Sequence, residues 1–120
     1  MTAQALAFAM VSISLSACAQ LLMKMGMMNV PTSGSSGTEL IFKVSTNPLI
    51  LGGFLTYGIG AVLWLKVLSQ TELSMAYPFV SLGFVLVAIL SWLVLGEHLS
   101  VGRVVGIALV VAGVVIVGKT

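Results

Sequence analysis

The sequence predicts an all-α membrane protein with four transmembrane helices, and two observations support this. Of its 120 residues, 59% are hydrophobic and 7% are charged, and the mean hydropathy is +1.20. Soluble domains carry about 25% charged residues, so this chain lacks the polar exterior of a soluble domain. The same composition excludes intrinsic disorder, which requires low hydrophobicity and high charge. Secondly, four apolar stretches each approach the roughly 20 residues that a helix needs to cross a bilayer.

The four stretches are expected to form one domain over residues 1–120. In chain order, the expected helices lie at about 3–27, 48–67, 75–95 and 101–118. The only long connection, residues 29–47, begins with a linker-like run rich in Ser and Gly. Its second half combines apolar residues with Glu39 and Lys43. That pattern fits either a short interfacial helix on the membrane surface or an unstructured loop.

Basic residues near the ends of the spans give a weak orientation signal. One side of the membrane would hold Lys66 and Lys119, and the other Lys24, Lys43 and Arg103. The side richer in Lys and Arg is usually cytoplasmic, and two against three is a small difference. This difference fits either a slight preference for one orientation or insertion in both orientations. Insertion in both orientations would permit an antiparallel homodimer.

Polar residues follow one face of the first expected helix. Each stands four positions after the one before: Ser12, Ser16, Gln20 and Lys24. Polar side chains are costly in hydrocarbon unless they face protein or water, so this stripe favours a polar groove. In the alternative interpretation, the serines bond to carbonyls of their own helix while Lys24 reaches the headgroups.

The third expected helix carries a second polar face. Tyr77 and Ser81 stand four residues apart, and a groove-facing role for Tyr77 competes with the usual role of tyrosine as an interfacial anchor. Pro78 is expected in the first turn of this helix, where a missing N–H costs little.

The fourth expected helix is rich in small residues, which let membrane helices approach one another closely. They are Gly102, Gly106, Ala108, Ala112 and Gly113. This helix is therefore predicted to serve in packing or dimerisation. The second helix also contains glycines that would permit close packing or bending, and Trp64 and Lys66 mark its far end.

The residues required for enzymatic chemistry are not arranged to perform it. The sequence has no phosphate-binding glycine loop, and no nucleophile is placed beside His98, so an enzyme is not expected. One cysteine (Cys18) and one histidine predict no metal site and no cofactor. A net charge of +2, scattered along the chain, predicts no nucleic-acid partner.

The charges favour an anionic ligand. A proton-coupled exporter of cationic drugs needs a carboxylate inside the membrane, whereas Glu39, Glu72 and Glu97 lie in expected loops or at span ends. The charges nearest the polar groove are positive: Lys24, with Lys66 and Arg103 at span boundaries. Lysine is a good point-charge partner for phosphate, so a phosphate-bearing headgroup fits this groove.

The order and spacing of these motifs resemble the small four-helix members of the drug/metabolite transporter superfamily. The motifs are AQLLMKMG in the first helix, AYPFVSLGF in the third and GIALVVAGVVIVG in the fourth. The pattern is most similar to paired subunits of the aminoarabinose–undecaprenyl-phosphate flippase kind, which are cousins of the small multidrug resistance exporters. Ser16 stands where those exporters hold a membrane glutamate, and Val80 replaces their tryptophan, which argues against proton/drug antiport.

The resemblance implies a small-multidrug-resistance-like fold and a flippase that moves a polyprenyl-phosphate-linked sugar across the bacterial inner membrane. It would work as a homodimer or as a heterodimer with a similar small subunit, in contact with membrane lipids. The implied headgroup site consists of Ser12, Ser16, Gln20, Lys24, Trp64, Tyr77, Ser81 and Arg103. Two alternatives remain: an exporter of small cationic drugs or metabolites with Glu97 as its proton-coupling acid, and a non-transporting accessory subunit.

Overall fold

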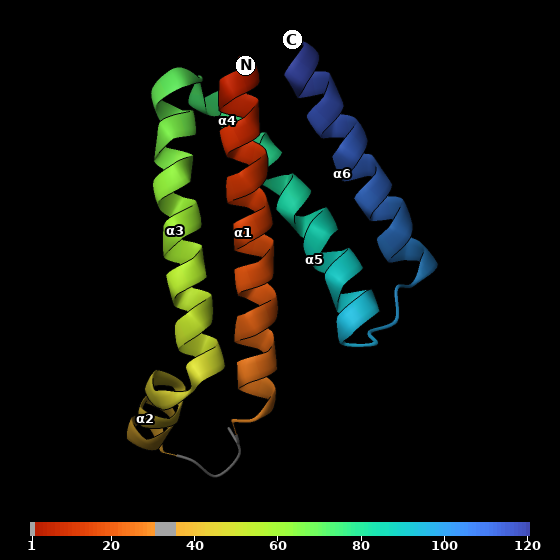
Figure 1. The fold of residues 1–120 in the computed structure, drawn as a ribbon. Coiled ribbons are helices and arrows are strands. Elements are labelled where there is room, and N and C mark those ends of the chain that lie inside the picture. The colour runs from red at the N-terminus through yellow and green to blue at the C-terminus, as the bar shows by residue number, and fades with distance from the viewer. Residues whose placement is uncertain (1, 31–35) are drawn as a thin grey trace.

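A computed structural model describes residues 2–30 and 36–120, and these fold into helices joined by short connections (Figure 1). The helices are α1 (Ala3–Met28), α2 (Gly37–Thr46), α3 (Pro48–Gln70), α4 (Leu73–Phe79), α5 (Ser81–Val94) and α6 (Val101–Lys119). α2 lies in the long connection, in the segment for which the sequence allowed either a short helix or an unstructured loop.

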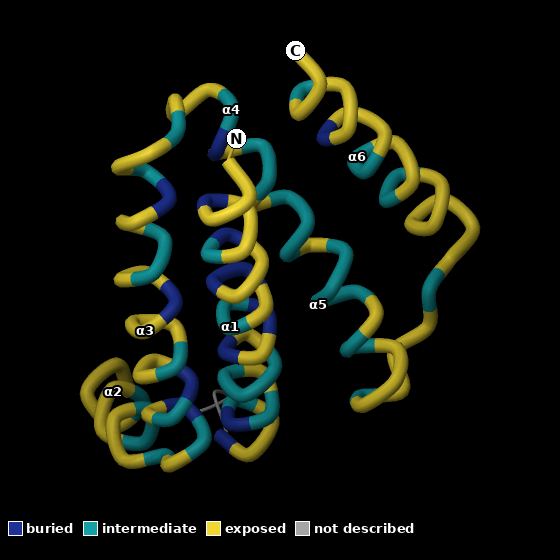
Figure 2. The backbone as a smooth tube through the Cα atoms, turned by 45° about the horizontal axis from the view of Figure 1, so that its top comes forward, coloured by how far each residue is buried: buried dark blue, intermediate teal, exposed yellow. Residues whose placement is uncertain are grey.

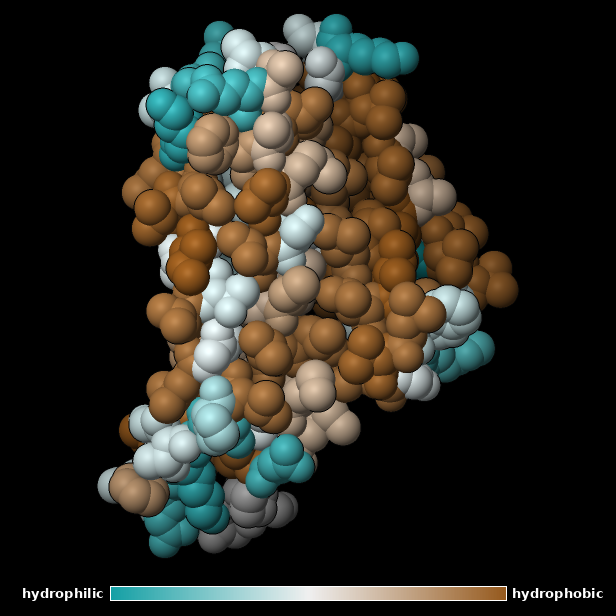
Figure 3. Space-filling view, in the orientation of Figure 1, coloured by the Kyte–Doolittle hydropathy of each residue, from teal (hydrophilic) through white to brown (hydrophobic). Residues whose placement is uncertain are grey.

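Within the described residues, four helical segments are long and apolar enough to cross a membrane, which confirms the predicted fold class. They are Ala3–Met28, Pro48–Gln70, Leu73–Val94 and Val101–Lys119. Figure 3 shows hydrophobic side chains over the middle of the visible face and hydrophilic ones gathered toward its two ends. Both termini and the α3–α4 connection lie at one end of the molecule, whereas α2 and the α5–α6 connection lie toward the other (Figure 1).

α1 is the most buried helix and packs mainly along α3 (Figure 2). The two backbones approach closely where α3 has glycines. A Cβ atom at Gly60 would lie 3.2 Å from the carbonyl oxygen of Ser12, and one at Gly53 would lie 3.0 Å from that of Ala19. Small residues are how membrane helices achieve close packing without a hydrophobic driving force. The expected role of glycine in the second span is therefore confirmed for Gly53 and Gly60.

Side-chain hydrogen bonds join α1 to α3 at three places, one of them between Gln70 Nε2 and Gln4 Oε1 across 3.3 Å. The Ser12 hydroxyl, which is buried, donates to the carbonyl oxygen of Gly60 across 2.6 Å. At the other end, Asn47 caps α3 by accepting hydrogen bonds from Leu49 N and Ile50 N, and its Nδ2 donates to the carbonyl oxygen of Gly26. Ser12 thus belongs to the helix contact, which neither interpretation of the polar stripe predicted.

Ser12→Ala should destabilise the protein by about 1 kcal/mol, because it removes a buried hydrogen bond and leaves the Gly60 carbonyl of α3 with one partner fewer. Thermal unfolding in detergent, followed by tryptophan fluorescence, measures this change. Ser14→Ala is the matched control, since the Ser14 hydroxyl bonds back to the Met10 carbonyl of its own helix on an exposed face. Equal melting temperatures for the two variants would contradict the assigned role of Ser12.

The third span, expected as one continuous helix, is broken at Val80 between α4 and α5. The prediction placed Pro78 in the first turn, but α4 begins at Leu73, so Pro78 is the sixth residue of the helix. Proline offers no N–H to the carbonyl four residues earlier, and its ring clashes with that carbonyl. The expectation that Pro78 costs little is therefore wrong, and the helix ends one residue after it.

α6 contacts the rest of the chain through a different face from its small-residue pairs. Val114 is buried, and a Cβ at Gly118 would lie 3.1 Å from the Phe79 ring. Gly102, Ala108, Ala112 and Gly113 are exposed, and Gly106 is half-buried. These residues are available to a second subunit, so the dimerisation role stays a prediction.

Candidate functional site

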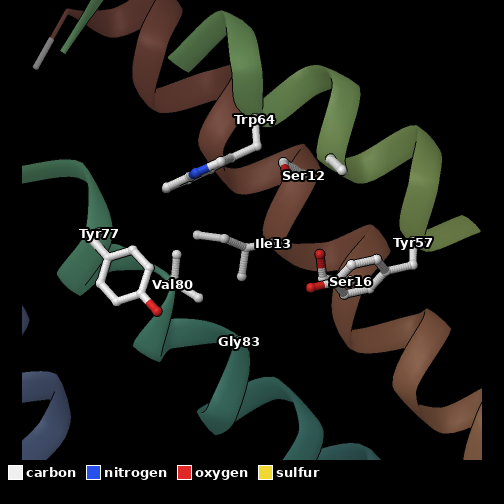
Figure 4. A pocket seen from close by; sticks show the side chains of 9 residues that line it. Ser12, Ile13, Ser16, Tyr57, Trp64, Tyr77, Val80 and Gly83 are labelled. Carbon is white, nitrogen blue, oxygen red and sulfur yellow. The ribbon is translucent and has the colours of Figure 1, made fainter. Parts of the chain in front are cut away.

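A cavity of about 300 Å³ opens between α1, α3 and the α4–α5 break. Figure 4 shows Tyr57 and Trp64 of α3 and Tyr77 of α4 around Ile13 and Ser16 of α1. We call it the aromatic cavity, after Tyr57, Trp64 and Tyr77. Tyr57 is 45% exposed and Tyr77 is 65% exposed, so both rings are open to a ligand.

The local structure explains why these aromatic side chains meet. Tyr57 and Trp64 stand seven residues apart, which is two turns of α3, so they lie on one face of that helix. Tyr77 of α4 lies across the cavity from α3, and Val80 and Gly83 complete the wall (Figure 4). Aromatic rings with hydroxyl or N–H tips suit a ligand that has both apolar and hydrogen-bonding faces, such as a sugar ring.

A second cavity, of about 260 Å³, lies beside the second half of α1. Gln20 and Lys24 of α1 line it, together with Ser91 of α5 and Glu97 of the α5–α6 connection. We call it the cationic cleft, although it also contains the Glu97 carboxylate. Among the described residues, no ion pair joins Lys24 to Glu97, so the ammonium group of Lys24 remains available to a ligand.

The α5–α6 connection places Glu97 in this cleft through local backbone geometry. Gly96 has a φ of +70°, a left-handed conformation that glycine adopts readily at a helix end. The Ser91 carbonyl accepts hydrogen bonds from Leu95 N and Glu97 N, which closes α5. Glu97 therefore lies at the end of a span, as the sequence predicted.

Arg103 lies on the other side of Glu97. It lines a third hollow, of about 800 Å³, which shares Val87, Ser91 and Glu97 with the cationic cleft. Its Nη1 donates to the His98 carbonyl oxygen across 3.3 Å, and its backbone N–H donates to the Ser100 hydroxyl. The connection before α6 thus holds the guanidinium group near the cleft, where its other N–H groups can meet an anion.

The structure divides the expected groove into two parts. Ser12, Ser16, Trp64 and Tyr77 line the aromatic cavity; Gln20 and Lys24 line the cationic cleft. Arg103 borders the adjoining hollow, and Ser81 lines none of these three cavities.

Tyr57 lines the aromatic cavity although it was not among the predicted site residues. Its position two turns before Trp64 on the same helix was the available signal.

Comparison with known proteins gives a consistent picture. Residues 2–119 match the EamA-like transporter family. The chain is 33% identical over 97 residues to proteins of Salmonella typhimurium, Salmonella newport and Salmonella enteritidis, each named "Probable 4-amino-4-deoxy-L-arabinose-phosphoundecaprenol flippase subunit ArnE". Each alignment covers 71% of this chain and 87% of the relative. No solved structure shows a significant match to the chain.

Proposed function

The chain belongs to the EamA-like transporter family, as a multi-pass transporter of the inner membrane, and we propose that it moves a polyprenyl-phosphate-linked sugar between the two leaflets. The observation that carries this proposal is the cationic cleft. Lys24 of α1 and Arg103 of α6 line adjoining hollows that both contain Glu97. The two positive charges outnumber the one carboxylate, so the local formal charge is positive and suits a phosphate.

Within this proposal, the headgroup uses both parts of the site. Lys24 pairs with the phosphate while Gln20 and Ser91 supply hydrogen bonds beside it. The sugar enters the aromatic cavity during its passage, where Tyr57, Trp64 and Tyr77 cover its faces. Aminoarabinose phosphoundecaprenol, the lipid in the relatives' name, is a substrate with the required phosphate and a small sugar.

The protein is further proposed to act with a second subunit. Its relatives are named as flippase subunits, and the small residues of α6 are exposed. Four helices enclose little volume, so a homodimer or a pair with a similar small chain would complete the path. Alternating packings of the helices would then open the site to one leaflet and to the other.

Flipping is tested in proteoliposomes that hold the amino-sugar lipid in both leaflets and are treated with an impermeant amine-reactive reagent. Without flipping, only the outer-leaflet half reacts; with flipping, the reaction goes to completion. Completion by this chain alone would support a homomeric flippase, and completion only with a similar second subunit would support a heteromeric one. A reaction that stops at half in both cases would overturn the proposed function.

Tyr57→Ala should slow this flipping roughly 2- to 10-fold, because losing one aromatic contact costs about 0.5–1.5 kcal/mol. Initial rates in the same assay measure the effect. Phe54→Ala is the matched control, since Phe54 is also on α3, is 58% exposed and does not line the aromatic cavity. Equal flipping rates for the two variants would show that Tyr57 does not contribute to the sugar site.

A further inference from the structure

The hollow of about 800 Å³ lies between α5 and α6 at the end where these helices join. We call it the α5–α6 groove and define it by Phe84, Val87 and Ala88 on one side and Arg103 on the other. Figure 1 shows α5 and α6 running alongside each other from the connection that joins them. The apolar residues come from α5 and, with Leu99, from the α5–α6 connection, whereas α6 contributes the guanidinium group.

The groove changes character along its length. Phe84 and Ala88 stand one helical turn apart and give an apolar wall; Phe84 is 58% exposed. One turn further along α5, Ser91 lies beside Glu97 and near Arg103, so the same groove ends in polar and charged groups. The distance from Phe84 to Ser91 along the helix is about 10 Å, at a rise of 1.5 Å per residue. A groove that is apolar along α5 and ends beside Arg103, Glu97 and the cleft that holds Lys24, where two positive charges face one negative charge, has the form of a site for an amphiphile with an anionic headgroup.

The groove is also continuous with the site already described. Val87, Ser91 and Glu97 line both the cationic cleft and the groove. A phosphate beside Lys24 and Arg103 would therefore have its hydrocarbon chain beginning at the polar end of the groove. This continuity selects the chain of the transported lipid over a bulk phospholipid or a second protein copy.

We infer that the α5–α6 groove binds the first isoprene units of the polyprenyl chain while the phosphate occupies the cationic cleft. This inference rests on the proposed function. The groove would keep the phosphate end of the lipid at the protein, so that the headgroup moves while its tail stays beside α5. Ala88, the small residue in the wall, leaves the space that the chain fills.

Photolabelling tests the groove directly. Proteoliposomes of the intact protein are loaded with a polyprenyl phosphate that carries a diazirine in its first isoprene unit, and labelled residues are mapped by mass spectrometry. We expect the label to concentrate between Phe84 and Ala88 and to exceed several-fold the label at Leu55, a lipid-exposed residue of α3 that is 69% exposed. Excess unlabelled polyprenyl phosphate should remove it, whereas the same excess of phosphatidylglycerol should not.

Three results would overturn the inference. The label could be as strong at Leu55 as in the groove, or phosphatidylglycerol could compete as well as the polyprenyl lipid, which would indicate bulk lipid. Protection of the groove from every probe would indicate a second subunit seated there.

A variant that fills the groove separates this inference from the proposed function. Ala88→Trp should reduce both specific labelling and flipping at least about tenfold, and Ala7→Trp, an equal change at an exposed position on α1, should leave both unchanged. Wild-type protein that flips the lipid while Ala88→Trp flips it equally fast would overturn the groove and leave the proposed function standing. Groove labelling of a wild-type protein that flips nothing, either alone or with a similar second subunit, would overturn the proposed function instead.

Discussion

Replacing Lys24 by Ala should reduce flipping of the sugar-phosphate lipid about 10- to 100-fold while leaving the folded protein intact. Hydrogen bonds to charged groups contribute about 1.5–3 kcal/mol, and the full effect appears in the rate if the pairing holds the headgroup in the transported state. Lys24 is exposed and lines the cationic cleft rather than a helix contact. The measurement is the rate at which headgroups that start in the inner leaflet become accessible to an impermeant reagent outside the liposome.

Two further variants make the Lys24 result specific. Lys24→Arg keeps the charge and should retain much of the activity. Lys66→Ala removes a similar charge at the opposite end of the molecule, from an exposed position on α3, and should flip like the wild type. A wild-type flipping rate in Lys24→Ala, or an equal loss of rate in Lys66→Ala, would contradict the placement of the phosphate in the cationic cleft.

Gly53→Leu should strongly damage the fold. A Cβ at Gly53 would lie 2.7 Å from Met23 Cγ and 3.0 Å from the Ala19 carbonyl oxygen, so the longer leucine side chain cannot fit without separating α1 from α3. Overpacking typically costs about 1–3 kcal/mol. We expect a lower melting temperature in detergent and a smaller yield of protein that elutes as a single species.

Gly52→Leu is the matched control, because a Cβ at Gly52 meets nothing within 4 Å. The two positions are neighbours on one helix and share the same cost or gain in helix propensity, so the difference between them measures the helix contact alone. Equal stability of the two variants would show that the α1–α3 packing tolerates a side chain at Gly53.

The four spans could be predicted from the sequence because hydrophobic length is a local property that needs no knowledge of packing. Family membership was predictable for a related reason: the motifs around Lys24 and Tyr77 keep their order and spacing along the chain, and the match to the EamA-like family confirms the resemblance.

The break at Val80 was missed because it depends on where the helix begins. A start two residues earlier than expected moves Pro78 from a harmless first turn into the helix body.

The division of the polar stripe into two cavities could not be derived from one helix. Helical spacing places Ser12 and Lys24 on one side of α1 but does not say which neighbour covers each residue. α3 covers Ser12 through Gly60, whereas α5 and the connection after it border Lys24. The spacing of Tyr57 and Trp64 puts both on one face of α3, but only the placement of α3 beside α1 shows that this face lines the aromatic cavity.

The location of both chain ends on one side of the molecule (Figure 1) has a practical consequence for subunit geometry. An even number of crossings returns the chain to the compartment in which it started. Two copies joined genetically by a hydrophilic tether are therefore forced into the same topology, whereas a tether containing one additional membrane-spanning segment inverts the second copy. Testing which of the two tandem genes restores function in living cells would therefore distinguish parallel from antiparallel pairing, without purification of either form.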